Sequence, residues 1–237
     1  MSTGPRPGKG DIQKMVERQM RNWELARAQR VQPRPTEAGE PIQEFVTLSR
    51  TVASGGGRVG RLLGERLGWP VFDREILQSM ADDDRVRARI YENLDEREVS
   101  WLEDAVRWLM RGDFKREDYF YRLSETVLAL ARRQTAVFLG RAVDCILPAD
   151  KGLRVRITAP HDRRVAEMAR RLGAPESQAG AELERIDKER DEYRRTYFST
   201  ATQDAVDFDL ILNLARFDTE QAVEVILTAL RQRKIIT

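Results

Sequence analysis

The chain has 237 residues, with 41 lysines and arginines against 39 aspartates and glutamates, so its formal net charge is only +2. Such a small charge argues against a general affinity for nucleic acid or for an anionic membrane, and we expect neither as a partner. Only six of the basic residues are lysines. The others are arginines, a residue type that binds carboxylates and phosphates through paired hydrogen bonds. A codon preference would produce the same excess of arginine over lysine.

The composition, 41% hydrophobic and 34% charged, is that of a soluble globular protein with one or two domains. No apolar run approaches the roughly 20 residues that a bilayer span needs, and residues 1–10 lack the apolar core of a signal peptide. The single cysteine, Cys145, cannot form an internal disulfide, which fits a reducing compartment. We therefore expect a cytoplasmic protein.

The first element is an amphipathic helix, because apolar residues recur at helical spacing from Asp11 to about Arg30. A linker follows, indicated by Pro33, Pro35, Gly39 and Pro41. Residues 1–44 thus form an N-terminal helical arm and linker. The apolar face of this helix needs a partner, so we expect it to pack on the main body or on a second subunit in a homodimer.

The main body, residues 45–237, alternates short apolar strands with helices. Strands are predicted at residues 45–48, 70–72, 136–139, 153–157 and 210–212. Helices are predicted at residues 59–67 and 74–80, throughout 84–134, between the fourth strand and Arg171, and at residues 176–197 and 219–233. This alternation predicts an α/β fold of three layers, α/β/α, around a mainly parallel five-stranded sheet.

A glycine turn, Ser54-Gly55-Gly56-Gly57, separates the first strand from the following helix. This arrangement presents backbone N–H groups and the positive end of a helix to an anion, typically a phosphate. The phosphate-loop pattern G-x-x-x-x-G-K-[ST] is not met, because with Gly57 as its second glycine the last two positions hold Arg58 and Val59. Shifting the frame back by one residue puts Gly57 at the lysine position. A tight turn without a ligand is the alternative interpretation.

Charged residues follow the strands at the edge where open α/β sheets bind ligands. Together with the glycine turn they resemble, in their order, the cytidylate kinase-like family of P-loop nucleoside monophosphate kinases. The motifs that carry the resemblance are Ser49-Arg50 through the glycine turn to Gly60, Phe72-Asp73-Arg74-Glu75-Ile76-Leu77, Gly140-Arg141-Ala142, Asp187-Lys188-Glu189-Arg190 with Tyr193, and Asp209-Leu210-Ile211-Leu212-Asn213.

The resemblance runs from about Phe45 to the C-terminus and implies a P-loop kinase-like domain over residues 45–237. It also implies a helical monophosphate-binding insertion at about 74–134 and a lid at about 174–200. The implied reaction is transfer of the γ-phosphoryl group of ATP to CMP or dCMP, with Mg²⁺. The expected partners are these small nucleotides.

The resemblance further assigns roles to single residues. It implies that the ATP phosphates are bound by the glycine turn and the next residue, that is by Ser54, Gly55, Gly56, Gly57 and Arg58. Catalysis falls to Arg58, Asp187 and Arg190, of which the last two are three residues apart and so share a helix face. Binding of the acceptor falls to Asp73, Arg74, Arg141, Arg185 and Arg194. No protein residue is assigned to a metal ion.

Other interpretations stay open at these positions. Asp73 is a suitable helix cap, Arg141 is placed to pair with Asp144, and the charges after Asp187 are compatible with a solvated helix that carries weak ion pairs. His161, the only histidine, is expected on the surface.

The glycine turn also departs from the family pattern, since Gly57 stands where relatives often have a cation and Val59 supplies no hydroxyl. Arg50 or Arg58 would then have to replace the loop lysine. The alternative function is a degenerate P-loop protein that binds a nucleotide with little turnover and has a regulatory or assembly role.

Overall fold

The computed structural model describes residues 8–29, 42–110, 118–198 and 205–237. The chain forms two compact units, a helical unit and a sheet unit, and it passes between them after Gln43, Val71 and Thr135. The N-terminal helix belongs to the same unit as the helices of the predicted insertion.

Within the described residues, five strands form a sheet in the order β2-β3-β1-β4-β5. The strands are β1 (Phe45–Arg50), β2 (Val71–Phe72), β3 (Ala136–Leu139), β4 (Gly152–Thr158) and β5 (Leu210–Asn213). The central strand β1 pairs in parallel with β3 and with β4, and β4 pairs in parallel with β5. The residues of β1 are buried up to Ser49, as expected for a parallel strand covered on both faces. The predicted α/β fold with a parallel five-stranded sheet is confirmed.

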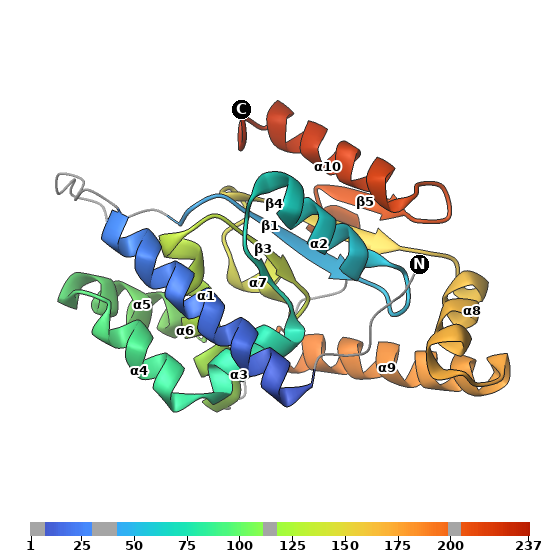
Figure 1. Cartoon of the computed structure of the whole chain (residues 1–237), viewed down its shortest axis with the longest axis horizontal. Helices are drawn as coiled ribbons and strands as arrows, with labels where there is room; N and C mark the ends of the chain where they lie inside the picture. The colour runs from blue at the N-terminus through green and yellow to red at the C-terminus, as the bar shows by residue number, and fades with distance from the viewer. Residues whose placement is uncertain (1–7, 30–41, 111–117, 199–204) are drawn as a thin grey trace. The chain divides into compact units, whose positions relative to one another are not determined.

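The helices of the sheet unit are α2 (Gly56–Leu67), α7 (Val143–Ile146), α8 (His161–Leu172), α9 (Glu176–Tyr197) and α10 (Thr219–Gln232), with a short 3₁₀ helix at Ala205–Asp207. Helices α2 and α10 pack on each other, and α2 also packs on β1 and β3 (Figure 1). Gly60 allows this close approach, because a Cβ atom there would lie 2.4 Å from Leu139 Cδ2. Helices α8 and α9 pack together as a hairpin.

The helical unit contains α1 (Lys9–Gln29), α3 (Arg74–Asp82), α4 (Asp84–Glu92), α5 (Glu96–Leu109) and α6 (Asp118–Arg133). Helix α1 packs against α3 and α6 and buries Val16, Met20 and Trp23. Arg89 of α4 adds ion pairs to Glu17 and Glu24 of α1, at 3.1 and 2.9 Å. The apolar face of the N-terminal helix is thus buried within its own chain.

The structure corrects several predicted boundaries. Helix α2 begins at Gly56, three residues before the predicted start, because the glycines extend the helix instead of preceding it. Residues 84–134 are not continuously helical: α4 ends at Glu92, and Asp95 starts α5 with a capping box. Helix α7 was not predicted.

Some expectations fall on residues that lie outside the described ranges. These are the linker from Pro33 to Pro41, the middle of the predicted 84–134 helix and the end of the predicted lid. In the part of the chain that the structure describes, no helix has both the length and the apolar composition needed to cross a membrane.

Candidate functional site

The glycine turn joins the carboxyl end of β1 to the first residues of α2. Gly55 caps the helix with a φ of 92°, in the left-handed region that glycine adopts without strain. The Ser54 hydroxyl donates to the Thr51 carbonyl at 2.9 Å and holds the turn closed. The first amides of a helix have no partner within it, so this end of α2 is suited to bind an anion.

Arg58 points to the β5 side of the turn. Its Nη2 atom lies 3.5 Å from the position that a Cβ atom on Gly55 would take, next to Leu214. Arg58, Leu214 and Phe217 line a cavity of about 380 Å³ together with Ser54. The predicted ATP-binding residues Ser54 and Arg58 therefore share a cavity beside the glycine turn.

Asp187 and Arg190 of α9 contact the chain on either side of the end of β1. The Asp187 carboxylate accepts from the Val52 amide at 3.3 Å and from Arg164 Nη1 at 2.5 Å. Arg190 Nη1 donates to the Arg50 carbonyl at 2.8 Å. Two of the three residues assigned to catalysis, Asp187 and Arg190, thus lie together on one face of α9, against the chain that enters the glycine turn.

Arg194, one turn further along α9, is buried and forms a bidentate ion pair with Asp144 of α7. The two nitrogen–oxygen distances are 3.2 and 2.5 Å, and the side chains are only 6% and 4% exposed. Burial by itself would lower the pKa of Arg194, but the hydrogen bonds and charge of Asp144 outweigh it and raise the pKa. Asp144, which the sequence offered as a partner for Arg141, therefore holds Arg194.

Arg141 lies in a strained turn after β3. Gly140, Arg141 and Ala142 have φ values of 78°, 55° and 52°, and a residue other than glycine pays about 1–3 kcal/mol to adopt such a conformation. The turn places the Arg141 guanidinium over the ring of Tyr193 of α9, at 5.2 Å from its centroid. Strain of this kind is typical of functional sites, where the surrounding structure holds a side chain in one place.

Arg156 is a candidate that the sequence analysis missed. It lies on β4 opposite Ser49 of β1, and its buried Nη1 atom has no hydrogen-bond partner among the described residues. Burial, followed by the like charge of Arg194, lowers its pKa. A guanidinium in such surroundings favours a nearby anion. The signal in the sequence was an arginine inside a strand whose neighbours Val155 and Ile157 are apolar.

Arg185, Asp73 and Arg74 are the remaining predicted site residues. Arg185 is on the exposed side of α9, where it pairs with Glu182 and Glu189. Asp73 and Arg74 lie at the start of α3 in the helical unit. The Asp73 carboxylate accepts from the Ile76 amide at 3.1 Å, so this residue does cap its helix.

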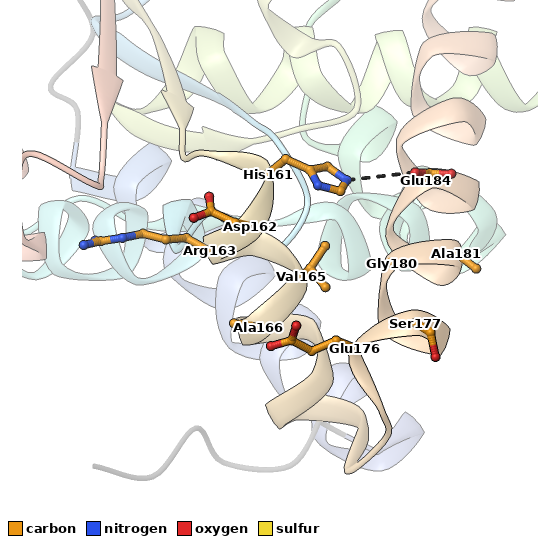
Figure 2. Close-up of a pocket in the computed structure, with 10 residues that line it drawn as sticks. All are labelled: His161, Asp162, Arg163, Val165, Ala166, Glu176, Ser177, Gly180, Ala181 and Glu184. Atoms are coloured by element: carbon orange, nitrogen blue, oxygen red, sulfur yellow. Dashed lines mark ion pairs between the residues drawn. The ribbon is translucent and has the colours of Figure 1, made fainter.

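Figure 2 shows a second cavity, of about 770 Å³, between α8 and α9. At one end His161 Nε2 lies 4.0 Å from Glu184 Oε1. The His161 side chain is 59% exposed, as expected for a surface residue. None of the predicted site residues lines this cavity, and the described residues contain no group of three or more His, Cys, Asp or Glu side chains arranged to hold a metal ion.

A parallel sheet with a glycine turn between its first strand and the next helix is an arrangement that α/β proteins use to bind phosphate groups. A model of the cytidylate kinase-like family matches residues 45–216, which is well over half of the chain. The protein belongs to the cytidylate kinase-like family.

Several solved structures are similar to this chain. An uncharacterized protein from Eubacterium ventriosum is 20% identical with a TM-score of 0.64, and the match covers 80% of this chain and 99% of that one. A shikimate kinase from Aquifex aeolicus is 17% identical with a TM-score of 0.41, over 81% and 99% of the two chains. A gluconokinase from Sinorhizobium meliloti is 14% identical with a TM-score of 0.42, over 81% and 95%. No curated protein matches the chain.

Proposed function

We propose that the protein is an ATP-dependent nucleoside monophosphate kinase with CMP or dCMP as acceptor. The observation that supports this proposal is the position of Arg50 at the glycine turn: Arg190 of α9 donates to its backbone carbonyl, and its side chain runs from Gly56 to Gly140, next to Arg141 in the chain. Phosphoryl transfer asks little covalent chemistry of a protein but much positioning and charge neutralisation. Guanidinium groups supply both.

ATP fits the glycine turn and the cavity beside it. The amides at the start of α2 are suited to its phosphates, and the cavity that Arg58 shares with Leu214 and Phe217 offers both a cation and apolar surface for the nucleoside. When bound, Mg²⁺ supplies positive charge to the phosphates of ATP. Ser54 would suit that ion, because its hydroxyl donates a hydrogen bond to the Thr51 carbonyl and keeps oxygen lone pairs for a cation.

The choice of CMP or dCMP is supported by membership of the cytidylate kinase-like family. In this proposal Arg141 binds the acceptor phosphate, while Asp73 and Arg74 contact the rest of the acceptor. Use of ATP also suits the cytoplasm, the compartment expected from the single cysteine.

The second candidate is a nucleotide-binding protein with little turnover. It is favoured by one observation, that Gly57 and Val59 replace the cation and the hydroxyl of an ordinary phosphate loop. Such a protein would still bind ATP through backbone amides, but it would lack part of the charge that stabilises the transition state.

An assay of the purified protein with ATP, Mg²⁺ and a panel of nucleoside monophosphates separates the candidates. Formation of CDP or dCDP, ahead of all other diphosphates, is the expected result. No turnover, combined with a higher melting temperature in the presence of ATP, would instead support the binding protein. Turnover of a different acceptor alone would keep the kinase and reject cytidine as its base.

A further inference from the structure

The residue that replaces the missing loop lysine can be inferred from the surroundings of the glycine turn. We propose that Arg50, the last residue of β1, brings its guanidinium to the β- and γ-phosphates of the bound nucleotide. This inference rests on the proposed function, and it selects Arg50 over Arg58, the other arginine that the sequence analysis left open for this role.

The aliphatic part of the Arg50 side chain crosses the start of α2. A Cβ atom added to Gly56 would lie 2.9 Å from Arg50 Cβ and 3.1 Å from Arg50 Cδ. Any residue other than glycine at position 56 would therefore collide with this side chain. The glycine in the first position of α2 keeps the path of Arg50 open along the helix end.

The head group of Arg50 reaches the turn after β3. A Cβ atom added to Gly140 would lie 3.1 Å from Arg50 Nη1. Strand β3 is the neighbour of β1 in the sheet, so the guanidinium lies where these two strands end, beside the start of α2. Parallel sheets bind ligands at this edge, and the strained turn that carries Arg141 begins at the same glycine.

Arg58 takes a different direction from the same loop. Its Nη2 atom is near Gly55 and Leu214, and its cavity includes Phe217 and Thr219, at the β5 side of the sheet. We therefore assign Arg58 to the nucleoside side of ATP. The position of Arg50 is fixed further by Arg190, which donates to its backbone carbonyl at 2.8 Å.

In the transfer step, an oxygen of the acceptor phosphate forms a bond to the γ-phosphorus while the bond to the β,γ-bridging oxygen breaks. The electron pair of the broken bond stays on that oxygen, which becomes part of ADP. Arg50 donates hydrogen bonds to the phosphate oxygens on which negative charge is concentrated, and preorganised donors of this kind stabilise the transition state.

The test compares Arg50→Met, Arg50→Lys and Arg58→Met, with Arg66→Met as a matched control. Arg66 lies at the far end of α2 and pairs with exposed Glu220 and Glu224. Methionine keeps an unbranched side chain over Gly56 while it removes the charge. Three quantities are measured: the calorimetric affinity for ATP, the calorimetric affinity for inorganic tripolyphosphate, which has no nucleoside, and kcat with ATP and CMP.

Arg50→Met is expected to lose at least about tenfold in tripolyphosphate affinity and on the order of 100-fold in kcat. Arg50→Lys should recover part of both losses. Arg58→Met should weaken ATP binding more than tripolyphosphate binding, and Arg66→Met should match the wild type. Near-wild-type tripolyphosphate affinity and kcat in a folded Arg50→Met protein, or a larger tripolyphosphate loss in Arg58→Met, would overturn the inference.

The two proposals fail separately in this design. A wild type that phosphorylates no nucleotide but binds tripolyphosphate through Arg50 would reject the kinase and keep the inference. If the wild type makes CDP and the Arg50→Met variant makes it equally well, the kinase is kept and the inference is rejected. If the wild type does not bind tripolyphosphate at all, Arg50 has no such role.

Discussion

At the scale of single residues, Arg190 connects the predicted lid to the chain that enters the glycine turn. Its Nη1 atom donates to the Arg50 carbonyl, and a guanidinium carries five N–H donors in a fixed fork. In the proposed function this side chain both holds the backbone of Arg50 and faces a phosphate. Such a group stabilises charge that develops during the reaction more than it contributes to the resting affinity for ATP.

We predict that Arg190→Ala lowers kcat by on the order of 100-fold while it changes the ATP dissociation constant only a few-fold. Steady-state kinetics and calorimetry on the same preparation measure the two quantities. Arg195→Ala is the matched control, since Arg195 is an exposed arginine on the same helix, and it should behave as the wild type. An unchanged kcat in Arg190→Ala would remove this residue from catalysis.

The residues of the site differ in how well the sequence predicts them. Asp187 and Arg190 were assigned from the family resemblance, and their spacing of three on a helix gives them a common face. The directions of the Arg50 and Arg58 side chains do not follow from a helical spacing. They depend on which neighbouring turn leaves room, which for Arg50 is the turn at Gly140. Arg156 was missed because pairing opposite Ser49 becomes visible only once the register of the sheet is known.

At the scale of elements, α9 is held to the sheet unit by three consecutive contacts along one face. Asp187 binds the Val52 amide, Arg190 binds the Arg50 carbonyl and Arg194 binds Asp144 of α7. The last of these is the most buried. Since α7 directly follows the turn that carries Arg141, the Asp144–Arg194 pair positions the end of the helix relative to that turn.

We predict that Arg194→Met or Asp144→Ala, each of which leaves one buried charge unpaired, destabilises the protein by roughly 3–5 kcal/mol. The double variant should be less destabilised than the sum of the two, because it leaves no lone charge. Urea unfolding measures these free energies. Arg185→Met, which removes an exposed arginine from the same helix, should cost less than about 1 kcal/mol. Additive effects in the double variant would contradict a direct interaction.

The elements themselves were largely predictable where their hydrophobic pattern is regular. Helix α9 has the predicted bounds, Glu176–Tyr197. The other predicted strands and helices differ mainly at their ends, except for the continuous helix predicted over residues 84–134, which is interrupted after Glu92. The pattern failed at α2, where glycines in a helical turn are indistinguishable from a loop, and at α7, whose four residues are too few to show a helical period. Both elements adjoin the candidate site, where backbone geometry serves ligand binding more than local preference.

At the scale of the whole molecule, the predicted roles divide between the two units. The glycine turn, Arg50, Arg58 and Arg190 belong to the sheet unit, while Asp73 and Arg74 belong to the helical unit. The family resemblance assigns ATP to the glycine turn and Arg58, in the sheet unit, and part of the acceptor to Asp73 and Arg74, in the helical unit. The two ligands should therefore protect the backbone amides of different segments, and each ligand can be added without the other.

Hydrogen–deuterium exchange with each ligand alone tests this division. Mg²⁺ with ATP should slow exchange of the amides from Val52 to Gly60, because bound phosphates occupy the N–H groups at the start of α2. CMP should slow exchange at the start of α3 and near Arg141, with little effect on the glycine turn. Inorganic phosphate at the same concentration controls for binding of a simple anion. If CMP instead protects the glycine turn and leaves α3 unchanged, the helical unit does not bind the acceptor, and Asp73 serves only as the cap of its helix.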